Sequence, residues 1–110
     1  MIYFDHSATT PIHPRVAEKI DYVNREHYAN PSSIYSLGRK AKSLIEKARN
    51  QVANAIGAKA EQIFFTSGGT EANNQVLCTK AEDKKKHIIV SSIEHPAILK
   101  VLKKIEPHGV

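Results

Sequence analysis

Apolar residues recur at helical spacing soon after the N-terminus. Val16, Ile20 and Val23 lie four and three residues apart, so they form one stripe on a helix. Pro14 stands just before this stripe, where a proline is tolerated because the first turn of a helix leaves its N–H unpaired. The helix must end before Pro31, since the residue that precedes a proline is pushed out of the α region.

A second and longer helix is predicted from about Ser36 to Ile56. Gly57 follows it at the position where a glycine often ends a helix in the left-handed conformation. The apolar stripe keeps a 3.6-residue period over five turns, and its members are Leu37, Ala41, Leu44, Ile45, Ala48, Val52 and Ile56.

The remaining pattern alternates short apolar runs with helical stretches. Residues 63–66 and 87–91 are predicted as buried strands. A turn at 67–70 leads from the first run into a helix from Glu71 to about Thr79, and Pro96 opens another helix after the second run. The inner face of that last helix is formed by Ala97, Leu99 (or Ile98) and Leu102.

The repeated order of strand, turn and helix predicts an α/β fold with a parallel pair of strands. Continuous apolar strands of this type need helices on both faces of their sheet. Residues 106–109 are predicted as a turn, and Val110 as the start of a third strand that the chain does not complete. The fold class is therefore α/β: N-terminal helices followed by the start of a parallel-type sheet, incomplete.

Length and composition describe an ordinary globular chain. It has 110 residues, 41% of them hydrophobic, and no run close to the roughly 20 apolar residues of a membrane span. A signal peptide is not expected at its start, and the single cysteine, Cys78, is typical of a reducing compartment, so we expect a cytoplasmic protein.

The formal net charge of +5 raises the alternative of a nucleic-acid partner. The basic residues are scattered, however, and no aromatic residues alternate with them as in proteins that bind single strands. The run at 84–86 is predicted as a polar loop. We expect solvated surfaces and neither nucleic-acid nor membrane binding.

The turn Ser67–Thr70 follows a predicted strand and opens a helix. Glycine allows close approach of a ligand to the backbone, and the start of a helix offers unpaired N–H groups to an anion. Thr70 adds a hydroxyl donor. These features indicate a phosphate site, with the alternative that Gly68 and Gly69 only form a tight turn and Thr70 only caps the helix.

His95 lies in the loop after the second predicted strand. Ligands of open α/β sheets bind beyond the carboxyl ends of the strands, so His95 and Thr70 are predicted at the same edge. The imidazole is suited to stack on a flat heteroaromatic ring whose phosphate is held near Thr70. The alternative is a histidine that only caps the helix opened by Pro96.

Four motifs occur in an order and spacing that resemble the cysteine desulfurases, class V members of the fold-type-I pyridoxal-phosphate (PLP) enzymes. The resemblance spans nearly the whole chain and identifies it as the N-terminal portion of such an enzyme. The motifs are Phe4–Pro11 (FDHSATTP), Asn30–Ser33 (NPSS) with Gly38 and Arg39, Phe65–Asn74 (FTSGGTEANN), and Glu94 with His95.

The resemblance implies roles for three residues. Gly69 and Thr70 bind the phosphate of PLP, and His95 stacks on the pyridine ring with a possible part in proton transfer. His6 and Tyr35 depart from the family pattern, which puts the exact substrate in doubt. Residues 1–35 are the N-terminal loop and helix segment, and 36–110 the first, truncated part of the PLP-binding α/β domain.

The same resemblance shows which catalytic groups to look for. A cysteine desulfurase needs a lysine that forms a Schiff base with PLP, an aspartate at the pyridinium nitrogen and a mobile cysteine that becomes a persulfide. No lysine or aspartate of this chain has the family context, and Cys78 is predicted as a small buried side chain in a helix. No histidine spacing suggests a metal site.

The sequence therefore predicts part of a cysteine desulfurase that is not catalytic alone. By resemblance, the whole enzyme converts L-cysteine to L-alanine, and it passes sulfur as a persulfide to an acceptor or iron–sulfur scaffold protein. A homodimer is expected. The alternatives are another class V enzyme, such as a selenocysteine lyase, or a non-catalytic remnant that serves as an interaction module.

Overall fold

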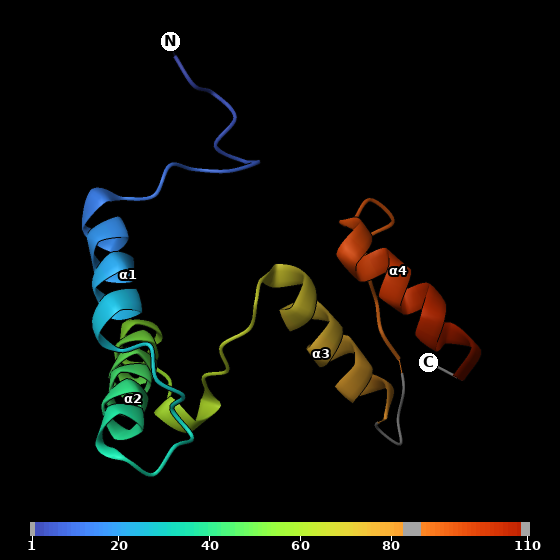
Figure 1. Cartoon of the computed structure of the whole chain (residues 1–110). Helices are drawn as coiled ribbons and strands as arrows, with labels where there is room; N and C mark the ends of the chain where they lie inside the picture. The colour runs from blue at the N-terminus through green and yellow to red at the C-terminus, as the bar shows by residue number, and fades with distance from the viewer. Residues whose placement is uncertain (1, 83–86, 109–110) are drawn as a thin grey trace. The chain divides into compact units, whose positions relative to one another are not determined.

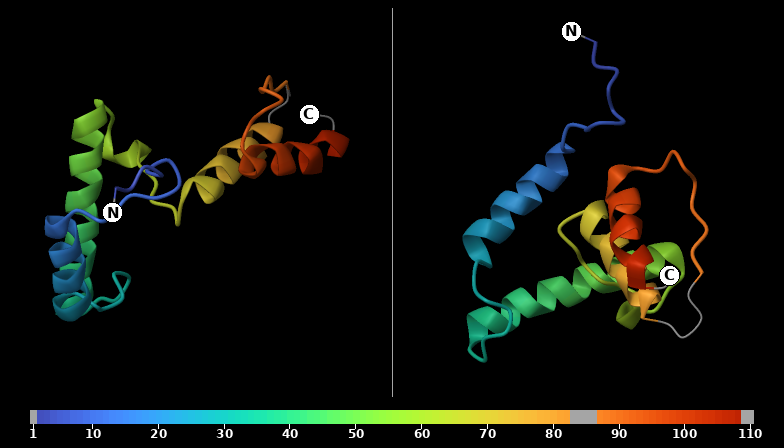
Figure 2. Two further views of the ribbon diagram at one scale, coloured as in Figure 1. Left: turned by 90° about the horizontal axis from the view of Figure 1, so that it is seen from above. Right: turned by 90° about the vertical axis from the view of Figure 1, so that its right-hand side faces the viewer.

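The computed structural model describes residues 2–82 and 87–108, and within these ranges every regular element is a helix (Figures 1 and 2). The chain divides into two compact units, one ending at Ile63 and the other beginning at Phe64. The predicted division of the chain into an N-terminal segment (1–35) and the first part of the PLP-binding domain (36–110) stays a prediction. The first unit holds α1 (Pro14–Glu26), α2 (Ser36–Ile56) and η1 (Ala60–Gln62), and the second holds α3 (Gly69–Ala81), α4 (Pro96–Ile105) and η2 (Glu106–His108).

Helix α1 begins at the predicted proline. His13 is its N-cap, and the Nδ1 atom of this histidine accepts a hydrogen bond from the amide of Arg15 at 3.3 Å. The helix ends at Glu26, and the amide of His27 still bonds to the carbonyl of Val23 at 2.9 Å. The prediction of a helix that stops before Pro31 is confirmed.

Helix α2 has the predicted bounds, and Gly57 ends it in the left-handed conformation with φ 68°. The amide of Ala58 bonds to the carbonyl of Ala53 at 2.9 Å, which satisfies an acceptor that the end of a helix otherwise leaves open. The local pattern therefore determined both ends of the longest element.

The loop before α2 lies directly against the start of that helix. Gly38 is buried there, and a β-carbon at this position would stand 2.5 Å from the carbonyl oxygen of Ser33 and 2.7 Å from that of Asn30. The guanidinium of Arg39 donates a hydrogen bond to the carbonyl of Ile34. Gly38 is thus required for the close contact between loop and helix.

Arg49 connects the middle of α2 to the end of the first unit. Its Nη1 atom donates a hydrogen bond to the carbonyl of Ile63, and its Nε atom lies 3.3 Å from a carboxylate oxygen of Glu46. A short 3₁₀ turn, η1, precedes Ile63 and was not predicted. Arg49 therefore fixes the residue at which the chain leaves the first unit.

The two predicted strands are not formed, so this part of the prediction is wrong for the structure as described. Residues 63–66 and 87–91 run without a helix or a strand ladder. A strand pairs its backbone N–H and C=O groups with neighbouring strands, and the described ranges supply no such partner. Phe64 and Ile89 are accordingly 71% and 88% exposed. The polar loop predicted at 84–86 and the third strand at Val110 lie outside the described residues.

The C-terminal helices form as predicted, with shifted bounds. Helix α3 starts at Gly69, two residues before the predicted start, and packs beside α4. The predicted inner residues of α4, among them Ala97 and Leu102, are half-buried, and Ile105 is buried. Residues 106–108, predicted as part of a turn, form the 3₁₀ turn η2. Across the described residues the buried apolar side chains are only Ala41, Ala53 and Ile105.

Candidate functional site

The structure brings two of the predicted site residues to one groove. Thr70 lies in the first turn of α3, and His95 caps α4, which packs beside α3 in the second unit (Figures 1 and 2). A groove of about 280 Å³ separates their starts. Its lining comprises Thr70 and Asn74 from α3, together with His95, Pro96, Ala97, Lys100 and Val101 at the start of α4.

The bend before α3 is shaped by its own side chains. The amide of Ser67 and the hydroxyl of Ser67 both donate to Oε2 of Glu71, at 2.7 and 2.6 Å. These two hydrogen bonds hold the pKa of the Glu71 carboxyl below its ordinary value. The bond from the hydroxyl has the larger effect and the bond from the amide the smaller one. The hydroxyl of Thr66 donates to the carbonyl of Gly68 at 3.2 Å. The bend therefore has a defined shape without a ligand.

The first turn of α3 is open to a ligand. Gly68, at the N-cap, makes no side-chain cap, and a β-carbon built on Gly68 or Gly69 would meet no atom within 4 Å. Both glycines and Thr70 are exposed. The first N–H groups of a helix have no partner inside it, and the positive end of the helix dipole lies there. The turn is thus suited to an anion that also takes a hydrogen bond from Thr70.

His95 has a defined hydrogen bond at the same end of the unit. Its Nδ1 atom accepts from the amide of Ala97 at 3.1 Å, and Pro96 occupies the first position of α4. The capping interpretation of this histidine is therefore confirmed. Because the side chain also lines the groove with Thr70, capping and ligand contact do not exclude each other.

Two groove residues had no role in the sequence-based prediction. The Oδ1 atom of Asn74 is buried and has no hydrogen-bond partner, and Lys100 lines the groove from α4. Asn74 follows Thr70 by four residues and Lys100 follows Pro96 by four, so helical spacing was the signal that would have found them.

Cys78 was predicted to be buried, and the structure corrects this: the thiol residue is exposed. It lines a second hollow together with Ser67 from the bend and with Thr70 and Glu71 from α3. In residues 2–82 and 87–108 no strand forms that could cover it. That Cys78 is not the persulfide nucleophile stays a prediction.

The two departures from the family pattern belong to the first unit. The ring of His6 meets that of Tyr3 edge-on, with centroids 4.9 Å apart, and Tyr35 is the exposed N-cap of α2. Their predicted influence on a substrate entrance stays a prediction.

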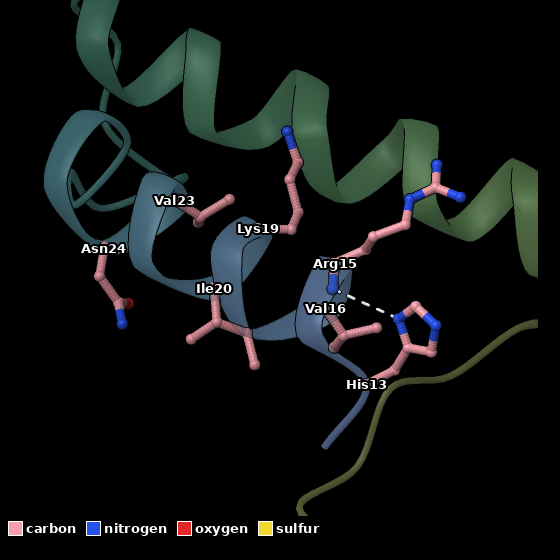
Figure 3. Close-up of a pocket in the computed structure, with 7 residues that line it drawn as sticks. All are labelled: His13, Arg15, Val16, Lys19, Ile20, Val23 and Asn24. Carbon is pink, nitrogen blue, oxygen red and sulfur yellow. Dashed lines mark hydrogen bonds between the residues drawn. The ribbon is translucent and has the colours of Figure 1, made fainter.

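A hollow of about 700 Å³ lies along α1 and does not have the features of a catalytic site (Figure 3). Val16, Ile20 and Val23 give it an apolar floor, and His13 at its end uses Nδ1 for the cap of α1. Among the residues that the structure describes, no three histidine, cysteine or acidic side chains gather as metal ligands do. In the same part of the chain, no helix is both long and apolar enough to span a bilayer.

Comparison with known proteins places these features in context. The family described as Aminotransferase class-V matches residues 2–110. Proteins named cysteine desulfurase IscS from Dictyoglomus turgidum and Methanosarcina thermophila are 44% and 45% identical over 98% of the chain. A solved structure titled NifS-like protein matches with a TM-score of 0.91 at 41% identity, over 98% of the chain.

The matched regions are only parts of these proteins. The chain spans about 28% of the length of both cysteine desulfurases and 30% of the NifS-like protein. The structural match shows that the chain has the fold of the corresponding part of a NifS-like protein, although the start of a sheet is not formed among the described residues.

Proposed function

Because the chain belongs to the aminotransferase class-V family, we propose that it supplies the phosphate cradle and the ring-stacking histidine of a PLP-dependent cysteine desulfurase. The names of its relatives support this reaction, and the groove shared by Thr70 and His95 carries the proposal. The cytoplasm is the proposed location.

The residues present fit PLP on two counts. The uncapped first turn of α3 and the hydroxyl of Thr70 suit the phosphate, and Gly69 leaves room for it because a β-carbon there would meet nothing within 4 Å. The imidazole of His95 borders the same groove and would be available to stack on the ring of the cofactor. Asn74 lines the same groove from α3.

PLP, when bound, serves as the electron sink for chemistry at the α-carbon of an amino acid. The part assigned to this chain is binding and orientation. The α3 amides and Thr70 would hold the phosphate, and His95 would stack on the ring. The shape of the bend is set in advance by Ser67 and Glu71, so little ordering is needed on binding.

The remaining catalytic groups belong to the complete enzyme in this proposal. A lysine bound to PLP, an aspartate at its ring nitrogen and a mobile cysteine lie outside residues 1–110. The substrate is L-cysteine, the products are L-alanine and a persulfide on the enzyme, and the sulfur passes to an acceptor or an iron–sulfur scaffold protein. The complete enzyme is a homodimer.

The test uses the full-length protein with PLP and L-cysteine. We expect alanine and persulfide sulfur in equal amounts, and we expect Thr70→Val to weaken PLP binding while it leaves the helix content unchanged. Thr79→Val, on the same helix but away from the groove, is the matched control. Selenocysteine is assayed in parallel, and activity with it but none with cysteine would replace the desulfurase by a selenocysteine lyase.

A further inference from the structure

Two histidines of the chain form the same local arrangement. His13 and His95 each precede a proline and each caps a helix. In both, Nδ1 accepts a hydrogen bond from the backbone amide of the residue two positions later in the chain. The donors are Arg15 at 3.3 Å and Ala97 at 3.1 Å. His95 lies in the groove, and His13 lies in the other unit.

This arrangement determines where the imidazole proton resides. A neutral imidazole has one nitrogen that donates and one that accepts. The nitrogen that accepts the amide of Ala97 carries no proton, so the proton of the neutral ring is on Nε2. Pro96 has no N–H of its own, and the amide of Ala97 is therefore the first one that the α4 backbone offers to the ring.

We propose that His95 acts in the site as a hydrogen-bond donor through Nε2–H, and that the backbone amide of Ala97 is the positioning group that fixes this tautomer and the orientation of the ring. The role in the site rests on the proposed function, whereas the tautomer rests on the cap alone. The α3 wall of the groove carries a buried acceptor, Oδ1 of Asn74, that has no partner.

The inference limits how His95 handles a proton. In the neutral ring Nε2 already carries a hydrogen, so a proton can be accepted only at Nδ1, and its arrival breaks the cap of α4. The charged groups near this end are Lys100, in the groove from α4, and Glu71, which lines the adjoining hollow on α3 together with Thr70 and Asn74. With the cap in place, His95 is thus suited to donate a hydrogen bond through Nε2–H.

The direct test is neutron diffraction from deuterium-exchanged crystals of the full-length protein at neutral pH. We expect deuterium on Nε2 of His95 and none on Nδ1, with the amide of Ala97 directed at Nδ1. Deuterium on Nδ1 of a neutral His95 would overturn the proposal. The result does not depend on activity or on the identity of the ligand, so it is separate from the test of the proposed function.

A variant gives the causal test in solution. Ala97→Pro removes the donating amide but also disfavours the α region at Pro96, so its helix content is checked by circular dichroism, whereas Ala97→Ser keeps the amide. With ¹⁵N-histidine labelling, we expect the Nδ1 and Nε2 resonances of His95 to shift towards a tautomer mixture in Ala97→Pro and to stay in place in Ala97→Ser. His13 is the internal control in both. Unchanged His95 resonances in a folded Ala97→Pro protein would contradict the role of the amide, and if that variant does not fold, the diffraction result decides.

Discussion

Ser67 donates two hydrogen bonds to one carboxylate oxygen of Glu71, from its amide at 2.7 Å and from its hydroxyl at 2.6 Å. The residue before the two glycines is therefore tied to the first turn of α3. The carboxylate is directed back along the chain to Ser67, and α3 has no side-chain cap, so its first amides stay available. The bend is held by Ser67 and Glu71, whereas the adjacent anion site consists of the first backbone amides of α3.

The first prediction concerns the acidity of Glu71. Its hydrogen bonds from Ser67 favour the charged form, so its pKa in the folded protein is lower than in the unfolded chain. The stabilisation is complete above the pKa of the unfolded chain and is lost as pH falls through the lower folded value. We expect a ¹³C titration of the Glu71 carboxyl to show this low pKa, and Ser67→Ala to raise it towards the ordinary value. An identical titration in both proteins would contradict the contact.

The second prediction separates two glycines by their function. Gly38→Ala places a β-carbon 2.5 Å from the carbonyl oxygen of Ser33. We expect a net loss of roughly 1–2 kcal/mol, since overpacking outweighs the gain in helix propensity. The measurement is the thermal unfolding of the full-length apoprotein by circular dichroism.

Gly69→Ala is the matched comparison for Gly38→Ala. A β-carbon at Gly69 meets no atom within 4 Å, so we expect the stability of the apoprotein to be unchanged or slightly raised by the gain in helix propensity. PLP binding, followed by absorbance, should nevertheless weaken, because the added methyl group occupies the approach to the helix start. Equal loss of stability in both variants would count against this division.

The third prediction concerns Arg49, whose side chain is 23% exposed. Arg49→Ala removes the donor to the carbonyl of Ile63, and we expect a loss of about 1.5–3 kcal/mol, the range for hydrogen bonds to charged groups. Glu46→Gln removes only the more exposed ion-pair partner and should cost less than about 1 kcal/mol. Denaturant unfolding of the full-length apoprotein measures both, and a larger loss in Glu46→Gln would reverse the assignment.

The fourth prediction concerns the unsatisfied oxygen of Asn74. A buried acceptor without a partner is unfavourable, so Asn74→Ala should leave the stability of the apoprotein unchanged or raise it. PLP binding should weaken in the same variant because Asn74 lines the groove. Asn73→Ala, next to it on α3 but outside the groove lining, is the control. A clear loss of apoprotein stability in Asn74→Ala would show that the oxygen already has a partner.

The fifth prediction concerns residues 1–110 expressed alone. We expect weak PLP binding at most and no release of sulfur from L-cysteine, because the proposal assigns the lysine and the cysteine of the reaction to other parts of the enzyme. Equilibrium dialysis against PLP and an alanine assay provide the measurement. Tight binding at one PLP per chain would contradict the proposal.

The features that could be predicted from the sequence are those that depend on residues close together along the chain. The bounds of α2 and the left-handed Gly57 follow from an apolar period and one flexible residue. The runs at 63–66 and 87–91 have the composition of strands, but a ladder needs partners that sequence composition cannot supply. The sequence therefore indicated where the chain can extend and not whether a sheet forms.

The candidate site shows the same division. Thr70 and His95 were predicted from motifs and from the rule on strand ends, and the structure places both at one groove. Asn74 was part of a quoted motif, yet the burial of its Oδ1 atom depends on how α4 packs against α3. Cys78 was misjudged for a related reason, because its exposure depends on what packs against α3.

The bare apolar side chains have a consequence for biosynthesis. Phe64 and Ile89 have no neighbouring strand among the residues that the structure describes, and they are largely exposed to water. Chains of this kind invite edge-to-edge association with other chains. We therefore expect a nascent polypeptide that includes this stretch to display exposed apolar segments and to associate with chaperones.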